Sequence, residues 1–315
     1  MMPKIVFLDT NTLGNDVHEE LQRFKNLGDV IYYDSTTANE ITDKVKNAEI
    51  IVTNKVVITK EIMASCSQLK LIVVTATGTN NVDLTAAKEL EIVVKNAVNY
   101  SSESVAQQTF AMLLSLMNGI HTYDSRVKSG QYSEGTSFTW IGNSFSEIAG
   151  KRFGIIGLGN IGTRVAEIAT AFGAEVIYYS TSGISRNEKY KLVDKEELFS
   201  TSDIISIHSP LNDKTANFVG EEEFKLMPTS SILINTGRGG IVNESDLANA
   251  LNTNEIAGAA VDVFAVEPIQ ENNPLLSIDV PGKILLSPHV AWASKEARKK
   301  LLEITYANIK EVNQS

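Results

Sequence analysis

Short runs of Val, Ile and Leu alternate with helix-like segments along nearly the whole chain, and this alternation limits the fold more than any other feature. In the first hundred residues the runs fall at 4–8, 30–33, 50–52, 71–74 and 92–94. Continuous apolar runs are typical of parallel strands covered on both faces. Amphipathic stretches lie between them, at about 16–24 and 38–46. The alternation therefore predicts an open α/β layer structure.

A second alternating series begins at Arg152. Its predicted strands fall at 153–156, 175–179, 203–207, 231–235, 257–263 and 283–286. Between the two series lie an apolar helical segment that starts near Ser101 and a stretch rich in Gly, Ser and Thr at 128–150. The latter predicts a long irregular connection with a functional or interface role. An amphipathic helix is expected at about 294–311.

Composition narrows the class of protein. The chain has 315 residues, of which 43% are hydrophobic, so a disordered protein is excluded. No apolar run approaches the ~18 residues of a membrane-spanning helix, and no signal peptide is evident. The net charge of −10 argues against a nucleic-acid partner. The single cysteine, Cys66, suits a reducing compartment, so we expect a cytoplasmic protein.

Gly157, Gly159 and Gly162 form a G-x-G-x-x-G loop between a predicted strand and a predicted helix at 161–172. In this setting the first glycine allows a tight turn, the second lets a pyrophosphate approach the backbone, and the third lets helix and strand pack closely. The phosphates then meet free N–H groups at the positive end of the helix. The loop predicts a dinucleotide cofactor.

The residue that follows the next strand does not decide whether the cofactor is NAD or NADP. An Asp or Glu there commonly binds the adenosine ribose and excludes the 2′-phosphate of NADP. This chain has Ser180 instead. A serine hydroxyl bonds a ribose oxygen without repelling a phosphate, and Arg186 is near enough in sequence to reach one, although a solvated loop cation is the simpler interpretation.

Three segments at the ends of predicted strands carry groups suited to carbonyl reduction. Arg238 stands among glycines, and its guanidinium can bind a carboxylate. His289 follows Ser287-Pro288 and is a candidate proton donor. Glu267 is the acid that would stabilise a protonated imidazole. Because the carboxyl ends of parallel strands meet at one edge of a sheet, these groups are expected to act together.

These motifs in this order resemble the D-isomer-specific 2-hydroxyacid dehydrogenases over nearly the whole chain, and most of all the glycerate dehydrogenase / hydroxypyruvate reductase branch. The motifs are the glycine loop, then Thr236-Gly237-Arg238-Gly239-Gly240, Asp262-Val263-Phe264 with Glu267-Pro268, and Pro288-His289. The resemblance implies two doubly wound parallel-sheet α/β domains. Residues 1–100 and 290–315 would form a flavodoxin-like substrate-binding domain, and 101–289 a Rossmann dinucleotide-binding domain.

The resemblance also implies roles for individual residues. Arg238, Glu267 and His289 would be catalytic. The substrate would be bound by Thr77, Gly78, Tyr100, Arg238 and Trp292. The cofactor, NAD or NADP, would contact Gly157, Gly159, Asn160, Ile161, Gly162, Ser180, His208, Ser209, Pro210, Thr215, Thr236, Gly237, Asp262 and His289. No metal site is predicted.

The implied activity is reduction of a small 2-oxo acid, such as hydroxypyruvate or glyoxylate, to the D-2-hydroxy acid with hydride from NAD(P)H. The alternative is a dinucleotide-sensing interaction protein of the same fold that lacks turnover. We expect a homodimer, formed through the long connection and the helix from Ser101, with Trp140 as either an interface anchor or a core residue. One departure from the family concerns Gln107 and Gln108, which stand where Glu-His is usual.

Overall fold

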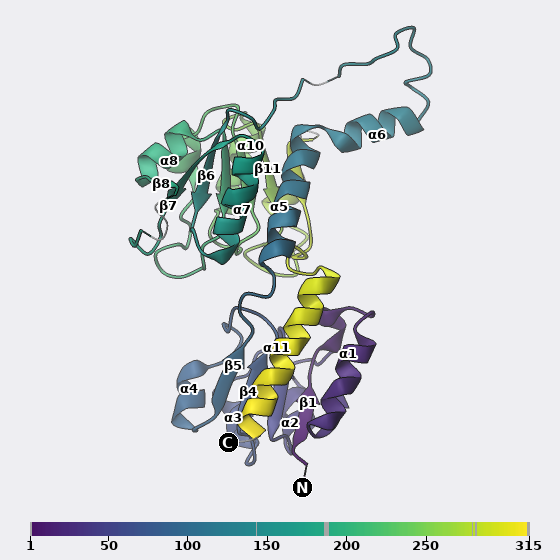
Figure 1. Cartoon of the computed structure of the whole chain (residues 1–315), viewed down its shortest axis with the longest axis vertical. Helices are drawn as coiled ribbons and strands as arrows, with labels where there is room; N and C mark the ends of the chain where they lie inside the picture. Colours follow the sequence, from purple (N-terminus) through teal and green to yellow (C-terminus); the bar gives the residue numbers. More distant parts are fainter. Residues whose placement is uncertain (1, 143, 186–188, 279, 281, 314–315) are drawn as a thin grey trace. The chain divides into compact units, whose positions relative to one another are not determined.

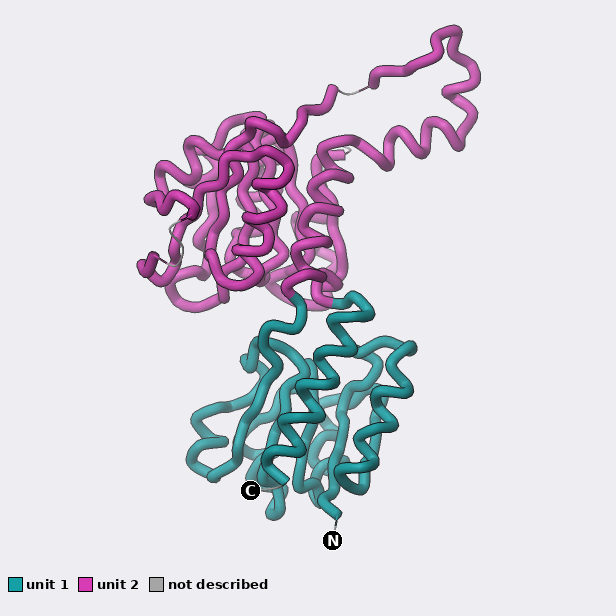
Figure 2. Tube along the Cα trace, in the orientation of Figure 1, with its two compact units in different colours: residues 1–101, 293–315 teal, residues 102–292 magenta. Residues whose placement is uncertain are grey.

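A computed structural model describes residues 2–142, 144–185, 189–278, 280 and 282–313. The chain divides into two compact units, shown in Figure 2: unit 1 is Met1–Ser101 with Ala293–Ser315, and unit 2 is Ser102–Trp292. Each unit contains one parallel sheet with helices on both faces, so the predicted fold class is confirmed. Among the described residues, no helix is both long and apolar enough to cross a membrane.

The sheet of unit 1 has the strand order β2-β1-β3-β4-β5, which is the flavodoxin-like order. Its strands are β1 (Lys4–Phe7), β2 (Asp29–Tyr32), β3 (Ile50–Thr53), β4 (Leu71–Val74) and β5 (Val93–Asn96). Every residue of β3 and β4 is buried, because helices cover both faces. The shorter elements are η1 (Thr10–Leu13), α1 (His18–Gln22), η2 (Arg23–Asn26), α2 (Ile41–Val45), α3 (Lys60–Ser65) and α4 (Leu84–Glu89).

The C-terminal helix α11 (Lys295–Asn313) returns to unit 1 (Figure 1). It packs against β4 and β5, and its apolar face buries Leu301, Leu302 and Ile309. The predicted helix near 294–311 is therefore confirmed. The predicted helix at 38–46 is shorter than expected, since only Ile41–Val45 is helical and the residues before it form a turn.

The sheet of unit 2 has seven parallel strands in the order β12-β11-β10-β9-β6-β7-β8. They are β6 (Arg152–Ile156), β7 (Glu175–Tyr179), β8 (Lys191–Leu192), β9 (Ile204–Ile207), β10 (Ile232–Asn235), β11 (Gly258–Val261) and β12 (Ile284–Leu286). The strand order reverses at β6, whose neighbours are β7 and β9. Ligands of such sheets bind beyond the carboxyl ends of the strands at this switch point.

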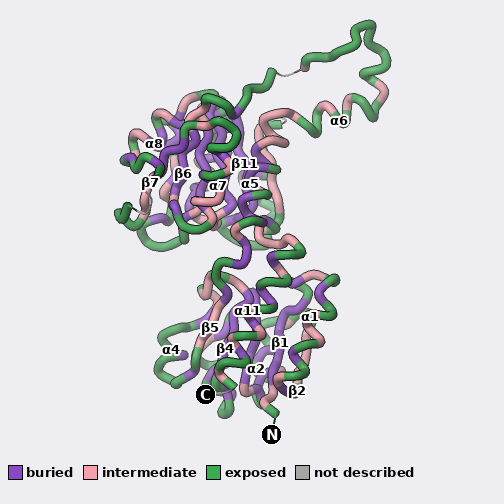
Figure 3. The backbone as a smooth tube through the Cα atoms, in the orientation of Figure 1, coloured by how far each residue is buried: buried purple, intermediate pink, exposed green. Residues whose placement is uncertain are grey.

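Helices cover both faces of this sheet, and Figure 3 shows its strands buried. On one face, α5 (Ser102–Met117) and α7 (Asn160–Ala171) pack together over side chains such as Phe110, Phe153 and Val165. On the other, α8 (Lys195–Thr201), α9 (Glu221–Leu226), α10 (Glu244–Asn252) and η3 (Pro274–Ser277) bury a second cluster.

One part of unit 2 stands apart from these layers. Helix α6 (Ile120–Lys128), which the sequence analysis did not predict separately, and residues 129–142 extend away from the sheet (Figure 1), whereas residues 144–150 lead back to it and bury Ile148. Those residues contain neither helix nor strand, as predicted. Trp140 packs edge-on against Tyr123 and lies 4.0 Å from the Arg126 guanidinium. We call residues 120–150 the arm.

Candidate active site

The glycine loop turns the chain from β6 into α7. Gly157 has a φ of 91°, and a Cβ there would lie 2.9 Å from the backbone nitrogen of Ser209. A Cβ at Gly162 would collide with the carbonyl oxygen of Gly157. Packing within the protein therefore requires these two glycines. At Gly159, by contrast, a Cβ would meet no described atom within 4 Å. The backbone at Gly159 is thus open to close approach by a ligand, which fits a pyrophosphate.

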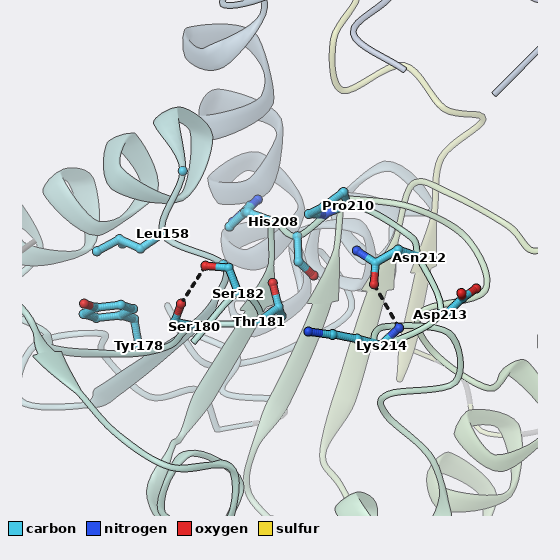
Figure 4. A pocket seen from close by; sticks show the side chains of 13 residues that line it. Leu158, Tyr178, Ser180, Thr181, Ser182, His208, Pro210, Asn212, Asp213 and Lys214 are labelled. Carbon is cyan, nitrogen blue, oxygen red and sulfur yellow. Dashed lines mark hydrogen bonds between the residues drawn. The ribbon is translucent and has the colours of Figure 1, made fainter. Parts of the chain in front are cut away.

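A pocket of about 660 Å³ lies beside this loop at the ends of β6, β7 and β9 (Figure 4). Several predicted cofactor residues line it together: Gly157, Gly159, Ser180, His208, Ser209 and Pro210. The pocket also has lining residues that sequence analysis missed: Leu158, Tyr178, Thr181, Ser182, Asn212, Asp213 and Lys214. Leu158 lies in the glycine loop, Tyr178 lies in the predicted strand 175–179, and the others follow a predicted strand by two to seven residues. These positions were the available signal.

Two polar atoms at the pocket lack a hydrogen-bond partner among the described residues. They are Nδ1 of His208 and Oγ of Ser209, and both are buried. The other ring nitrogen of His208, Nε2, lies 2.9 Å from Oγ of Ser206. Burial lowers the pKa of His208 to about 3, so the imidazole is neutral near pH 7 and cannot serve as an acid there. Unpaired buried polar atoms are costly, and a bound nucleotide offers groups that could pair with them.

Other predicted cofactor residues do not line this pocket. The Thr215 hydroxyl donates to the Pro210 carbonyl (2.7 Å) and accepts from the Asn212 amide (2.8 Å), so it holds its own loop. Thr236 Oγ1 lies 3.0 Å from Thr109 Oγ1, and the Gly237 amide donates to the Asn235 side chain. Asn160 and Ile161 begin α7. Contact between these residues and a dinucleotide stays a prediction.

His289 and Glu267 form a close pair. Nδ1 of His289 lies 2.7 Å from Oε2 of Glu267, while Oε1 of Glu267 accepts the backbone N–H of Phe264 at 3.0 Å. The exposed fractions of the His289 and Glu267 side chains are 23% and 30%. Nε2 of His289 has no hydrogen-bond partner among the described residues. An imidazole that is oriented by a carboxylate at one nitrogen and can exchange a proton at the other suits general acid–base catalysis.

Hydrogen bonds to Asp262 hold the backbone around His289. His289 has a φ of 53°, in the left-handed region, and its amide donates to the Asp262 carbonyl (2.8 Å). The Asp262 carboxylate accepts from the Ser287 hydroxyl (2.5 Å) and from the amides of Val290 (3.0 Å) and Ala291 (2.9 Å). Burial raises the pKa of Asp262. Its predicted contact with the cofactor stays a prediction, since both carboxylate oxygens already hold the segment that carries His289.

The loop that carries Glu267 is held by Glu244, which sequence analysis did not single out. The Glu244 carboxylate accepts the Ala265 amide and the Asn273 side-chain amide, each at 2.7 Å. Gly239 packs directly against the Phe264 carbonyl, where a Cβ would collide. The loops after β10 and β11 are therefore in contact, which brings Arg238 and Glu267 onto adjacent loops.

The guanidinium of Arg238 forms no ion pair with the described residues. Its Nη1 donates to the neighbouring Gly237 carbonyl at 2.8 Å, and no described carboxylate pairs with it. The side chain is half-buried. A guanidinium without an ion-pair partner can donate two parallel hydrogen bonds to a carboxylate. Arg238, Glu267 and His289 follow the adjacent strands β10, β11 and β12 at one edge of the sheet.

The remaining predicted residues lie elsewhere. Thr77, Gly78 and Tyr100 belong to unit 1, where the Thr77 carbonyl accepts from the Asn96 side chain (2.7 Å) and Tyr100 is buried. Trp292 is the last residue of unit 2. Gln107 is exposed on α5. In the part of the chain that the structure describes, no three His, Cys, Asp or Glu side chains are grouped to hold a metal ion.

Comparison with known proteins found relatives that match nearly the whole chain. A family model described as D-isomer specific 2-hydroxyacid dehydrogenase, NAD binding domain, matches residues 110–291. A glycerate dehydrogenase from Methylorubrum extorquens is 37% identical over 98% of this chain and 96% of its own length. A hydroxypyruvate reductase from Blautia hydrogenotrophica is 34% identical over the same shares. The solved structure of an acyclic imino acid reductase in complex with NADPH and D-Arg has a TM-score of 0.87, at 31% identity, and covers 98% of this chain and 96% of that chain.

Proposed function

The chain belongs to the D-isomer-specific 2-hydroxyacid dehydrogenase family, and we propose that Arg238, Glu267 and His289 are its catalytic residues. It is an oxidoreductase that reduces a small 2-oxo acid of the hydroxypyruvate or glyoxylate type to the D-2-hydroxy acid with NADH or NADPH. The observation that carries the catalytic assignment is the 2.7 Å bond between His289 and Glu267, together with an Arg238 on the adjacent loop that pairs with no described carboxylate.

The chemistry divides between substrate binding and proton transfer. The Arg238 guanidinium binds the substrate carboxylate and polarises the neighbouring carbonyl. When bound, the reduced nicotinamide supplies a hydride to the carbonyl carbon. Nε2 of His289 donates the proton that the carbonyl oxygen takes up, and the Glu267 carboxylate stabilises the protonated imidazole before that transfer. In the reverse direction, the neutral imidazole takes the hydroxyl proton.

The cofactor belongs at the carboxyl edge of the unit 2 sheet. The open backbone at Gly159 and the first turn of α7 suit the pyrophosphate, and the pocket lined by Ser180, Ser209 and Pro210 suits the adenosine half. Asp262, Thr236 and Gly237 would then face the nicotinamide half.

Unit 1 is proposed as the substrate-binding domain. The segment after β4 carries Thr77 and Gly78, whose backbone N–H groups would bind the substrate carboxylate. Tyr100 and Trp292 would line the substrate pocket. We further propose that the enzyme works in the cytoplasm, since the chain has one cysteine, which is buried and unpaired.

A homodimer is proposed through the arm and α5. The arm exposes 92% of Phe138, 78% of Ile141 and 58% of Phe145. Neighbouring apolar side chains left in water are typical of an interaction surface. A second copy of the chain is the partner that such a surface fits, because most oligomers of enzymes this size are symmetric pairs.

The activity is tested by following oxidation of NADPH and NADH with hydroxypyruvate, glyoxylate, pyruvate and larger 2-oxo acids. We expect the highest kcat/KM with hydroxypyruvate or glyoxylate, and a product of D configuration. Absence of turnover with every acid, from folded protein that binds dinucleotide tightly, would instead support the dinucleotide-sensing alternative.

The proton donor is tested by His289→Ala. The expected loss in kcat is about 10²–10⁴-fold, the usual contribution of a general acid. Dinucleotide affinity should remain near that of the wild type, because the substitution removes proton transfer and not the nucleotide pocket. His18→Ala, on exposed α1, is the matched control and should keep full activity. A loss of less than tenfold would show that another group donates the proton.

A further inference from the structure

We propose that the pocket at the end of β7 is a subsite for the 2′-phosphate of NADP, with Lys214 as the cation that selects this cofactor over NAD. The inference rests on the dinucleotide-binding function of unit 2 and adds which of the two dinucleotides is preferred. Two independent observations carry it: the polar groups that follow β7, and the state of Lys214 on the loop after β9.

The residues that follow β7 present hydroxyls in place of a carboxylate. Ser180, Thr181 and Ser182 all line the pocket. Oγ of Ser180 donates to the Ile184 carbonyl (2.8 Å) and lies 3.2 Å from Oγ of Ser182, so the turn is ordered by its own bonds. The Thr181 hydroxyl has no hydrogen bond among the described residues. Since the Ser180 hydroxyl donates to Ile184 and Ser182 then donates to Ser180, the Thr181 hydroxyl is the one left to donate to a phosphate oxygen, whereas an Asp or Glu at position 180 would repel the phosphate.

Lys214 approaches the same turn from the opposite wall. Figure 4 shows its side chain extended toward Thr181. The Lys214 amide donates to the Asn212 side chain (2.9 Å), and the bonds of Thr215 fix the same loop, so the side chain starts from a held backbone. No described carboxylate forms an ion pair with the ammonium group of Lys214.

Among the described residues that line this pocket, one is an acid. Asp213 precedes Lys214, but in Figure 4 its carboxylate is directed away from the serine–threonine turn. In the described part of the pocket, the face toward Ser180, Thr181 and Ser182 is therefore lined by hydroxyls and by Lys214. In a chain with a net charge of −10, a lysine that pairs with no described carboxylate forms, with the Thr181 hydroxyl, a local anion site. A phosphate monoester on the ribose matches this donor set, while the uncharged ribose diol of NAD leaves the cation without a partner.

The test compares dissociation constants, which do not depend on turnover. We expect NADPH to bind at least ~10-fold more tightly than NADH, and 2′,5′-ADP more tightly than ADP by a similar factor, since a charge-assisted bond to phosphate has that strength. Lys214→Met should weaken NADPH by about 10- to 100-fold and leave NADH within about twofold. Lys225→Met, on the exposed face of α9, is the matched control and should change neither.

The outcomes separate this inference from the catalytic proposal. Equal or tighter binding of NADH would overturn it, and so would a Lys214→Met variant that weakens both dinucleotides equally. Failure of the folded protein to bind either dinucleotide would overturn it together with the cofactor assignment. A preference for NADPH that Lys214→Met abolishes supports the subsite even if no 2-oxo acid is reduced, and in that case only the catalytic proposal fails. Ser180→Asp should lower NADPH affinity without lowering that for NADH.

Discussion

At the scale of single residues, two histidines of unit 2 lie in opposite surroundings. His289 is partly exposed and bonded to the Glu267 carboxylate. His208 is buried, and its one hydrogen-bond partner among the described residues is the Ser206 hydroxyl. The sequence alone offers four histidines, and only their surroundings distinguish a proton donor from an imidazole that stays neutral. Because burial lowers the pKa of His208, this residue carries a stability cost in acid.

The pKa of His208, lowered to about 3 by burial, gives a prediction for acid stability. Between the ordinary pKa of about 6.5 and the folded value, the unfolded chain takes up a proton and the folded chain does not. Stability from this group is therefore complete above pH ~6.5 and is lost as pH falls, by up to ~1.4 kcal/mol per pH unit. His208→Gln should flatten the fall in the free energy of urea unfolding between about pH 7 and pH 5.

The control for that measurement is His18→Gln on exposed α1, which should keep the wild-type acid slope. An unchanged slope in His208→Gln would mean that the imidazole takes up its proton in the folded state. The substitution is close in size and retains an amide that can bond Ser206, so the comparison isolates the titrating group.

At the scale of elements, most strands could be predicted because buried parallel strands are continuous runs of Val, Ile and Leu. The predicted runs at 50–52, 71–74 and 175–179 all fall within observed strands. The two-residue edge strand β8 has no such run, since both of its residues are exposed. Helix α6 was missed because its residues have no buried face within the chain.

The catalytic motifs could be predicted from the sequence, but the residues that hold or complete the site from other loops could not. Arg238, Glu267 and His289 stand in recognisable motifs at strand ends. Glu244 stands in none, because its role depends on contact with a loop twenty-one residues further along the chain. Lys214 likewise reaches the pocket across a loop from β9 to the end of β7. Contacts between separate loops at one sheet edge follow from tertiary packing, which a local pattern does not encode.

Glu244 is predicted to act as a positioning residue for Glu267. In Glu244→Gln, the new NH₂ group would face a donor, either the Ala265 amide or the Asn273 side chain, and one bond to the Glu267 loop would be lost. We expect kcat to fall about 10-fold, as for a misplaced catalytic group, while the dissociation constant for dinucleotide stays unchanged. Stability should fall by about 1–3 kcal/mol.

The matched control is Glu222→Gln on the exposed side of α9, which should alter neither quantity. If stability falls in Glu244→Gln while kcat stays at the wild-type value, then Glu244 supports the fold alone and does not position Glu267. The division between kcat and cofactor affinity therefore distinguishes the two roles.

At the scale of the whole molecule, the two units differ in whether they are formed by one segment of the chain or by two. Unit 2 is continuous in sequence, whereas unit 1 needs α11 from the far end of the chain to cover its sheet. Both units have their own buried cores, and among the described residues of the arm only Ile148 is buried, in the core of unit 2. In the contacts that the structure describes, the Trp140 ring packs on Tyr123 and Arg126 of α6. The arm also has exposed apolar side chains, such as Phe138 and Ile141.

The dimer predicted from this surface can be measured by light scattering at micromolar concentration. The wild-type chain has a mass of 34.4 kDa, and we expect a particle of twice that mass. Replacing Phe138 and Ile141 with Asp should shift the mass toward the single chain, because a charged group in an apolar interface has no partner to offset its lost hydration. Leu84→Asp, at an exposed apolar position of α4 in unit 1, should leave the dimer intact. A wild-type monomer, or a dimer that survives both substitutions in the arm, would contradict assembly through this surface.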